Sequence, residues 1–354
     1  MKKYIIPVLI VIVILLSYQT FRSIFNSRSS VVEPSNLGAS ATTVTCSNLN
    51  TPVLVASSTT AGQYIAAGST GIADAAKFTY KFTFGNNGCT IAGIKELKFS
   101  ATNATSVKVG GISAPVISGV AYLAGLSLTV PAGSSNLNVD VYVSYPAVGS
   151  GGVASNSTSQ IALTYVKYWA TAKSGNNYAG SNIITAITPS ISAPMMMLVN
   201  SKPAITVSQS GNSVLAVGSN EVIDATVTAD THGSIKLNSL PIKLSVIGAT
   251  LSNSSIIVKD SSNSVVATTN TSVTSGNPVI SFSKGYALTA GKSQTFKVYI
   301  SIASINKTGA ASLAASLGDS SNFSWSDSTG KVMTGNNKTY LYNYPTNSSA
   351  IYKK

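Results

Sequence analysis

The sequence predicts an all-β protein with two tandem β-sandwich domains after an N-terminal apolar helix. Three observations support this fold class. Apolar and polar residues alternate with a period of two in many short runs, which is typical of strands that bury one face. Turn-forming residues separate these runs about every 8 to 12 residues, the spacing of a sandwich. The order of the runs also repeats after about 150 residues.

The start of the chain is a targeting segment and not part of the sandwich fold. Two lysines precede an almost unbroken apolar run, Ile5–Leu16, and aromatic residues flank this run. We assign residues 1–22 to a signal peptide or membrane anchor and residues 23–44 to a linker. No small-x-small cleavage site follows the run within Ser17–Arg22. An uncleaved anchor is therefore favoured, with the rest of the chain exported.

A type IV pilin also begins with an apolar helix and ends in a β-domain. Pilins carry a glycine before the apolar run and an early glutamate within it. Here no glycine precedes the run, and the first acidic residue is Glu33. A pilin-like filament subunit is therefore a less favoured interpretation.

The runs after residue 45 have the pattern of antiparallel strands with one buried face. In Lys77–Phe84, aromatic residues alternate with lysine and threonine. Leu137–Ser144 and Phe296–Ile302 alternate in the same way between branched or aromatic residues and polar ones. Each run predicts a half-buried strand.

Short motifs recur in the same order in the two halves of the chain, which indicates a tandem duplication. The matched pairs are Ile65–Ser69 with Leu215–Ser219, Ile94–Ser100 with Leu240–Ser245, Leu128–Gly133 with Leu288–Gly291, and Tyr168–Ala170 with Ser324–Ser326.

The repeat sets the expected domain bounds. We predict sandwich domains over residues 45–193 and 205–354, with an inter-domain linker over 194–204. The linker contains the methionine triple Met195–Met197. A soft binding surface is one interpretation of these methionines, but packing where the two domains meet is favoured.

The charge balance excludes several kinds of chemistry. Only 9% of the 354 residues are charged, with 23 basic residues, 10 acidic residues and one histidine. The net charge of +13 does not indicate nucleic-acid binding, because both arginines, Arg22 and Arg28, flank the apolar segment and the lysines are spread singly. Nucleic acid is therefore not an expected partner.

The two cysteines, Cys46 and Cys89, predict one disulfide, because the body of the chain is expected to be exported. The crosslink would join the entry to the first domain to a hairpin at Gly85–Cys89. Asn87-Gly88 within that hairpin is a strong signal for a type I′ turn.

No catalytic, cofactor-binding or metal-binding residues are predicted. His232 lies in a predicted turn and lacks a recognisable nucleophile and acid partner. Glu221, Asp224 and Asp230 are near one another in sequence but lack the spacing of a calcium loop. Gly149–Gly152 is not followed by the residues of a phosphate-binding loop.

Trp169 and Trp325 occupy matching places in the repeat. This favours a shared role in core packing. The alternative is that these tryptophans and surface tyrosines form a platform for stacking sugars.

Several of these motifs resemble the immunoglobulin-like repeats of large bacterial cell-surface and S-layer-like proteins, in particular those of the Patescibacteria. The likeness spans nearly all of residues 45–345. It rests on Ala67–Ser69, on the turns Val130–Gly133 and Leu288–Gly291, and above all on Asn322–Asp327. The resemblance implies immunoglobulin-like sandwiches in an exported, non-catalytic surface protein.

We therefore expect an exported cell-surface protein with a structural or adhesive role, anchored to the membrane by its N-terminal segment. Other surface proteins or glycans are candidate partners, and no cofactor is expected. A carbohydrate-binding or enzyme-accessory surface module is the alternative function.

Overall fold

The structure is a computed structural model that confirms the all-β fold. Its only helical elements in the described residues are two short 3-10 turns, η1 (Ala56–Ser58) and η2 (Ser320–Asn322). Val44–Lys354 form one compact unit. The apolar segment predicted over residues 1–22 lies outside the described residues. Those are 49–84, 89–130, 134–174, 177–209, 214–252, 256–269, 276–335, 341, 344–345 and 348–352.

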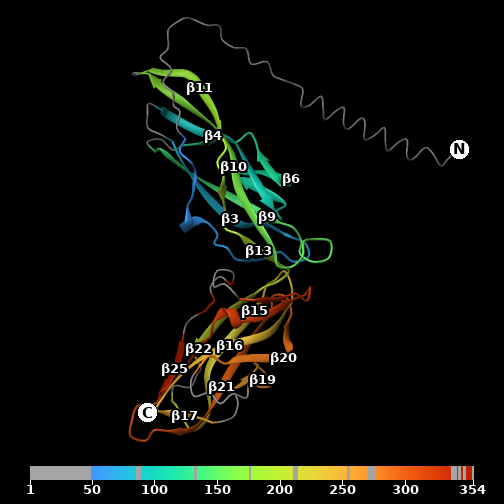
Figure 1. Cartoon of the computed structure of the whole chain (residues 1–354), viewed down its shortest axis with the longest axis vertical. Coiled ribbons are helices and arrows are strands. Elements are labelled where there is room, and N and C mark those ends of the chain that lie inside the picture. The colour runs from blue at the N-terminus through green and yellow to red at the C-terminus, as the bar shows by residue number, and fades with distance from the viewer. Residues whose placement is uncertain are drawn as a thin grey trace, which may run out of the picture. The chain divides into compact units, whose positions relative to one another are not determined.

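The first sandwich contains thirteen strands in one hydrogen-bonded sheet that is folded into two layers (Figure 1). One layer has the order β1-β3-β9-β5, and the other is built on β4 and β10. The strands are β1 (Val53–Leu54), β2 (Tyr64–Ala66), β3 (Ile72–Thr83), β4 (Cys89–Thr102), β5 (Ser106–Val109), β6 (Ile112–Ile117), β7 (Val120–Leu123), β8 (Leu128–Thr129), β9 (Asn136–Tyr145), β10 (Ser157–Ser174), β11 (Asn177–Ile187), β12 (Ile191–Ser192) and β13 (Met196–Val199).

Strand β6 joins the two layers of the first sandwich. Its first part pairs with β5 up to Pro115, and its last two residues pair with β7. Proline has no backbone N–H to donate, so a strand can leave its partner at that position without losing a ladder hydrogen bond. Pro115 therefore lies where β6 changes from one layer to the other.

The second sandwich consists of two separate six-stranded sheets. Their orders are β14-β15-β21-β18-β19, with β17 beside β21, and β24-β23-β16-β22-β25, with β20 beside β16. The strands are β14 (Pro203–Gln209), β15 (Gly218–Ala229), β16 (Ile235–Ile247), β17 (Ala249–Leu251), β18 (Ile256–Lys259), β19 (Val265–Thr269), β20 (Val279–Leu288), β21 (Ser293–Ile305), β22 (Ser312–Leu317), β23 (Ser324–Asp327), β24 (Val332–Thr334) and β25 (Ser348–Tyr352).

The two sandwiches pair their strands in the same order. β3 pairs with β9 and β9 with β5, as β15 pairs with β21 and β21 with β18. The long strand β10 corresponds to two strands, β22 and β23, that both pair with β16. Between them, the Asp319 side chain accepts a hydrogen bond from the Ser321 N–H and caps η2, which ends the extended run.

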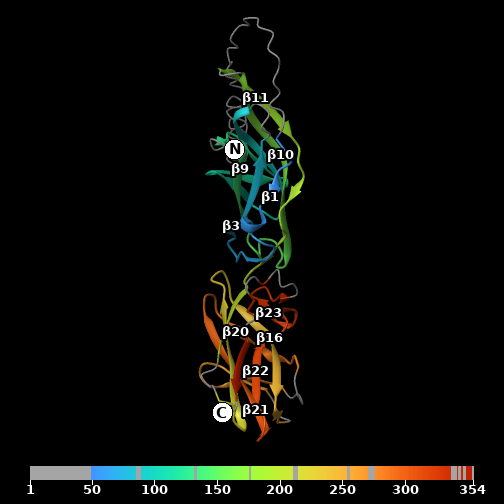
Figure 2. The same ribbon diagram turned by 90° about the vertical axis from the view of Figure 1, so that its left-hand side faces the viewer.

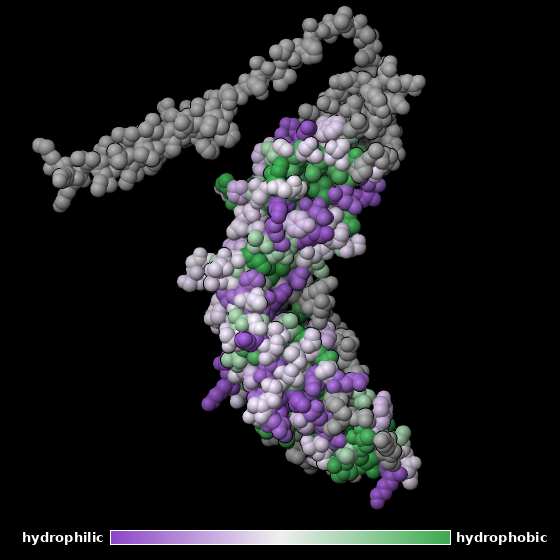
Figure 3. All heavy atoms as spheres, turned by 180° about the vertical axis from the view of Figure 1, so that it is seen from behind, coloured by the Kyte–Doolittle hydropathy of each residue, from purple (hydrophilic) through white to green (hydrophobic). Residues whose placement is uncertain are grey.

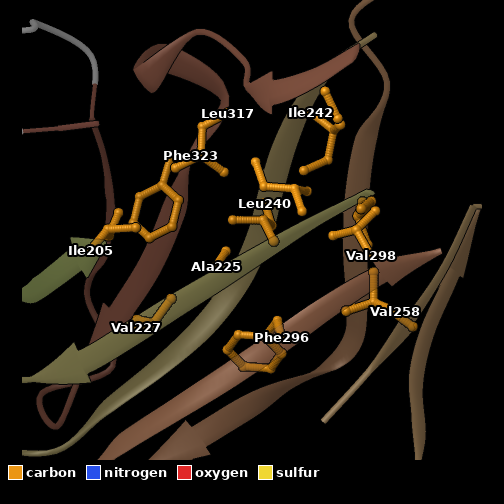
Figure 4. Packing of buried hydrophobic residues seen from close by; sticks show 14 of the residues in the cluster. Ile205, Ala225, Val227, Leu240, Ile242, Val258, Phe296, Val298, Leu317 and Phe323 are labelled. Atoms are coloured by element: carbon orange, nitrogen blue, oxygen red, sulfur yellow. The ribbon is translucent and has the colours of Figure 1, made fainter. Parts of the chain in front are cut away.

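Each sandwich has its own hydrophobic core. One cluster of buried residues runs from Leu49 to Leu198, and the other runs from Val199 to Ile351 and includes Tyr64. Figure 4 shows Phe296 and Val298 from one sheet of the second sandwich facing Leu240 and Ile242 from the other. The alternation predicted for Phe296–Ile302 is confirmed, because its four apolar side chains are all at most 3% exposed.

The stretch predicted as a linker, residues 194–204, is built into the sheets. It contains β13, labelled in Figure 1, which pairs with β10 and, in parallel, with β2, and it contains the first residues of β14. Figure 2 shows strands of both sandwiches from a second side, among them β10 of the first and β16 of the second. Met196 is buried in the first core and Met197 packs against the second. The prediction that these methionines pack where the two sandwiches meet is therefore confirmed for Met196 and Met197, whereas Met195 is 42% exposed.

Phe296→Ala tests the second core. Phe296 is fully buried and contacts the rings of Phe282 and Tyr286, so its loss should lower the free energy of unfolding by about 3–5 kcal/mol. Denaturant unfolding measures the effect. Val265→Ala is the control, because Val265 is 56% exposed and should change stability by less than about 0.5 kcal/mol. Equal losses in the two variants would contradict the packing described above.

Candidate functional site

A groove of about 520 Å³ lies on the outer face of the β3–β9–β5 layer. Alternation places Phe78 and Val141 in the core beneath it, so the intervening residues of the same strands point outward. Polar side chains line much of the groove: Ser58, Lys77, Thr79, Lys108, Asn138, Asp140 and Tyr142.

The charged groups of the groove are held in place by one another. Lys77 Nζ lies 3.4 Å from Asp140 Oδ2, and the Thr79 hydroxyl donates to Asp140 Oδ1 at 2.6 Å. Lys108 pairs with Asp74, and its ammonium lies 5.7 Å from the centre of the Tyr142 ring. Both ammonium groups are therefore paired with a carboxylate while their side chains stay 37% and 40% exposed.

The rest of the groove is apolar or bare backbone. Leu137, on the core-facing side of β9, and Leu128, from β8 in the other layer, contribute aliphatic surface beside the hairpin. The hairpin between β5 and β6 turns through Gly110 and Gly111, whose φ angles of 54° and 89° favour glycine. No other group lies within 4 Å of the position that a Cβ would take at Gly111, so that end of the groove is open.

The second sandwich carries a similar set of side chains on β15, β21 and β18. The Lys259 ammonium lies 4.8 Å from the centre of the Tyr299 ring. The Tyr299 hydroxyl donates to Glu221 at 2.6 Å, and Lys297 Nζ lies 3.4 Å from the same carboxylate. Burial and this hydrogen bond raise the pKa of Tyr299 to about 12. Burial and the neighbouring Glu221 raise the pKa of Asp224.

A third group lies on the outer face of β4, β7 and β10. The Lys98 ammonium lies 4.9 Å from the ring centres of both Tyr122 and Tyr165. Glu96 accepts hydrogen bonds from Tyr122 and, at 2.8 Å, from Lys167. Burial alone would raise the pKa of Glu96, but these hydrogen bonds outweigh it and lower the pKa, while the bond to Glu96 raises the pKa of Tyr122 to about 12.

A buried polar network joins the two sandwiches. The Asp327 carboxylate is 5% exposed and accepts from the Ser155 hydroxyl and the Asn200 N–H through one oxygen. Its other oxygen accepts from the N–H and the hydroxyl of Thr329. The Asn200 amide donates to the Val148 carbonyl and accepts from Ser328. Residues of both sandwiches thus satisfy one buried carboxylate and one buried amide.

Aromatic packing completes the junction. Tyr64 from β2 meets Trp325 from β23 edge to face at 5.3 Å, and its hydroxyl donates to the Thr334 carbonyl. The Trp325 indole N–H donates to the Ser201 carbonyl. The Lys202 ammonium donates to the Tyr64 carbonyl, and burial lowers its pKa.

The two tryptophans differ in environment, although the repeat matches them. Trp325 is fully buried, so it has the predicted core role and cannot stack on a sugar. Trp169 lies against Gly93 on the outer face of β4, with the Lys95 ammonium 5.7 Å from the centre of its ring. The break between β22 and β23 explains why equivalent sequence positions have different surroundings.

The candidate catalytic and metal residues are not assembled into a site. His232 lies in the turn after β15, as predicted, and its ring nitrogen bonds to Asp230. Glu221 instead contacts Lys297 and Tyr299. The described residues contain no group of three or more side chains able to hold a metal ion. Gly149 belongs to a loop that approaches Thr329 at the junction.

The predicted Cys46–Cys89 disulfide stays a prediction, because Cys46 lies outside the described residues. The predicted turn at Asn87-Gly88 also lies outside them. Between residues 49 and 352, as far as the chain is described, no helix is both long and apolar enough to cross a membrane.

Sequence reasoning missed the lysine–tyrosine groups and the Asn200–Asp327 network. A signal for the former is present, because Lys108, Tyr142, Lys259 and Tyr299 all occupy outward positions of alternating strands. The network left no such signal in the sequence, since hydrogen-bonded partners such as Ser155 and Asp327 are 172 residues apart along the chain.

Comparisons with known proteins give distant structural likenesses alone. No family model and no curated protein matches the chain. The C-terminal domain of the Streptococcus pyogenes antigen I/II-family protein AspA is 10% identical, with a TM-score of 0.23, over 86% of this chain and all of that domain. Collagen adhesin from S. aureus is also 10% identical, with a TM-score of 0.19, over 83% of this chain and 95% of the adhesin.

Red sea bream transglutaminase is 14% identical, with a TM-score of 0.26, over 81% of this chain and 31% of the enzyme. TM-scores of this size carry no argument about binding or activity. None of these comparisons identifies the Patescibacterial repeats that the sequence resembles, so that resemblance stays an expectation.

Glu96→Gln tests the group on β4. At pH 7 the variant should be less stable by up to about 1 kcal/mol, because the side chains involved are partly exposed. The folded-state pKa of Glu96 is below the unfolded value, so its contribution is present above the unfolded pKa and is lost as the pH falls through the folded pKa. Denaturant unfolding at several pH values should show the difference shrinking as the pH falls below the ordinary glutamate pKa of 4.5 and vanishing once Glu96 is protonated in both states. A difference that persists at pH 2 would argue against this origin.

Asp327→Asn tests the junction. Either orientation of the asparagine amide would turn its NH₂ group toward a backbone N–H, of Asn200 or of Thr329, and leave buried donors unpaired. The free energy of unfolding should fall by about 1–3 kcal/mol. The control is Asp260→Asn, in an exposed turn that asparagine also suits. Equal stability of the two variants would show that the network does not stabilise the fold.

Proposed function

We propose that this chain is an exported, non-catalytic cell-surface protein that displays its two β-sandwiches as one stiff unit, with residues 1–22 as a membrane anchor. The buried junction between the sandwiches is the observation that carries the proposal. A flexible tether between two independent domains leaves its polar groups in water. Here Asn200 and Asp327 are buried and bonded across the junction instead, so bending there would expose or unpair both groups.

The surface chemistry supports a role outside the cytoplasm. Residues 31–354 contain 19 lysines, no arginine and 10 acids, and their polar surface is mainly hydroxyl and amide. On the face shown in Figure 3, hydrophilic residues lie in small groups among pale and apolar ones. Such a surface keeps a protein soluble without forming one large charged patch.

A structural role alone would explain the stiff junction. An adhesive role would also require a face that binds a partner. The three lysine–tyrosine groups provide outward-facing aromatic and charged side chains for such contacts with surface proteins or glycans. The predicted Cys46–Cys89 disulfide would crosslink the segment entering the first sandwich to β4 and is part of this proposal.

The proposal is tested on intact cells that express the full chain with a C-terminal epitope tag. Protease added outside the cells should remove the tag, and fractionation should place the chain with the membrane. Non-reducing peptide mapping of the same sample should recover Cys46 linked to Cys89. A tag that resists protease on intact cells but is degraded after lysis would show that the body is not displayed on the cell surface and would overturn the proposal.

A further inference from the structure

We propose that the groove beside the β5–β6 hairpin of the β3–β9–β5 layer binds an acidic saccharide, with the sugar against Tyr142 and Asn138 and its acidic group at Lys77 and Lys108. The inference goes beyond the display function proposed above. It concerns the purified protein and does not depend on where the chain is located.

The groove has the size and the mixed lining of a small-ligand site. Its volume of about 520 Å³ is within the range of about 300–1,000 Å³ that such sites occupy. The Tyr142 ring can cover the C–H face of a sugar ring, and Leu128 and Leu137 add aliphatic surface next to the core. The exposed Asn138 amide offers a donor and an acceptor, which matches a hydroxyl group, itself both donor and acceptor.

The two lysines supply the donors for an anion, although the Asp140 carboxylate also lines the groove and pairs with Lys77. Each ammonium has three donors and uses one in its ion pair, with Asp140 or Asp74, so donors remain for a ligand. The ion pair of Lys77 is long, at 3.4 Å, and both pairs are partly exposed, so reorienting either lysine costs little. The ring of Tyr142 holds the Lys108 ammonium at the groove.

The charge of the whole body favours the same ligand class. The excess of 19 lysines over 10 acids in residues 31–354 attracts polyanions over long distances. This part of the chain has no arginine, and lysine pairs with carboxylate and phosphate alike. The charge therefore indicates an anionic ligand, and a carboxylated sugar is the probe used below.

The second sandwich supplies a matched control. Lys297 lies 3.4 Å from its acid and is 37% exposed, the same values as for Lys77, and Lys259 lies over Tyr299 as Lys108 lies over Tyr142. The double variant Lys259→Gln/Lys297→Gln therefore removes the same charge from β18 and β21, the counterparts of β5 and β9, without touching the groove.

The test is calorimetric titration of the full chain, purified in an uncharged detergent without sugar groups, with trigalacturonate. Maltotriose serves as the neutral sugar and triglutamate as the anion without a sugar. We expect trigalacturonate to bind more tightly than either, with affinity falling as salt is added. Lys77→Gln/Lys108→Gln should weaken binding at least about tenfold, and the matched double variant less than about threefold.

Tyr142→Ala should also weaken binding, whereas Tyr142→Phe and Tyr299→Ala should not, with circular dichroism checking that each variant is folded. An equal loss of affinity in the two lysine double variants would show that net charge alone attracts the ligand, and it would overturn the proposed site. Triglutamate binding as tightly as trigalacturonate would overturn the saccharide part, and equal binding of maltotriose would overturn the acidic part. Absence of binding to trigalacturonate would overturn the whole inference while leaving the display function intact.

Discussion

The buried carboxylate of Asp327 is the interaction on which the arrangement of the body depends. A carboxylate removed from water is costly unless hydrogen bonds replace its hydration, and here four donors from both sandwiches do so. The residues that carry these donors are Ser155, Asn200 and Thr329, which lie in different loops or strand ends. Satisfying them together fixes those segments against one another, and so the two cores behave as parts of one unit.

This constraint gives the connector its form. Met196 and Leu198 enter the first core, whereas Met197 and Val199 pack in the second, so successive side chains of β13 alternate between the two cores. The buried Lys202 ammonium, bonded to the Tyr64 carbonyl, and the Tyr64–Trp325 contact add to the same junction. A stiff body leaves the outer faces of the sheets as the surfaces available for contacts, and the lysine–tyrosine groups lie on those faces.

Alternation made much of the fold predictable. It decided which side chains of Lys77–Phe84, Leu137–Ser144 and Phe296–Ile302 face the core, because a strand turns successive residues to opposite sides. Repeated motifs made it possible to predict two sandwiches of similar order. The same reasoning matched Trp169 with Trp325, yet the Asp319 cap and η2 interrupt the second strand and give the two rings different surroundings. The local cap therefore decides the surroundings of the two rings, and the weak repeat in the sequence does not.

The sequence by itself determined the strand-rich class, the scarcity of charge and the absence of a recognisable catalytic motif, since these follow from composition and from a period of two along the chain. Tertiary structure decided what lies together across the sheets. Lys77, Lys108 and Tyr142 form one groove because antiparallel pairing places β3 and β5 on either side of β9. Ser155, Asn200 and Asp327 meet because loops and strand ends of the two sandwiches lie against each other, where their polar groups form buried hydrogen bonds. Contacts between residues so far apart in the chain depend on strand register and core packing, which no local pattern encodes.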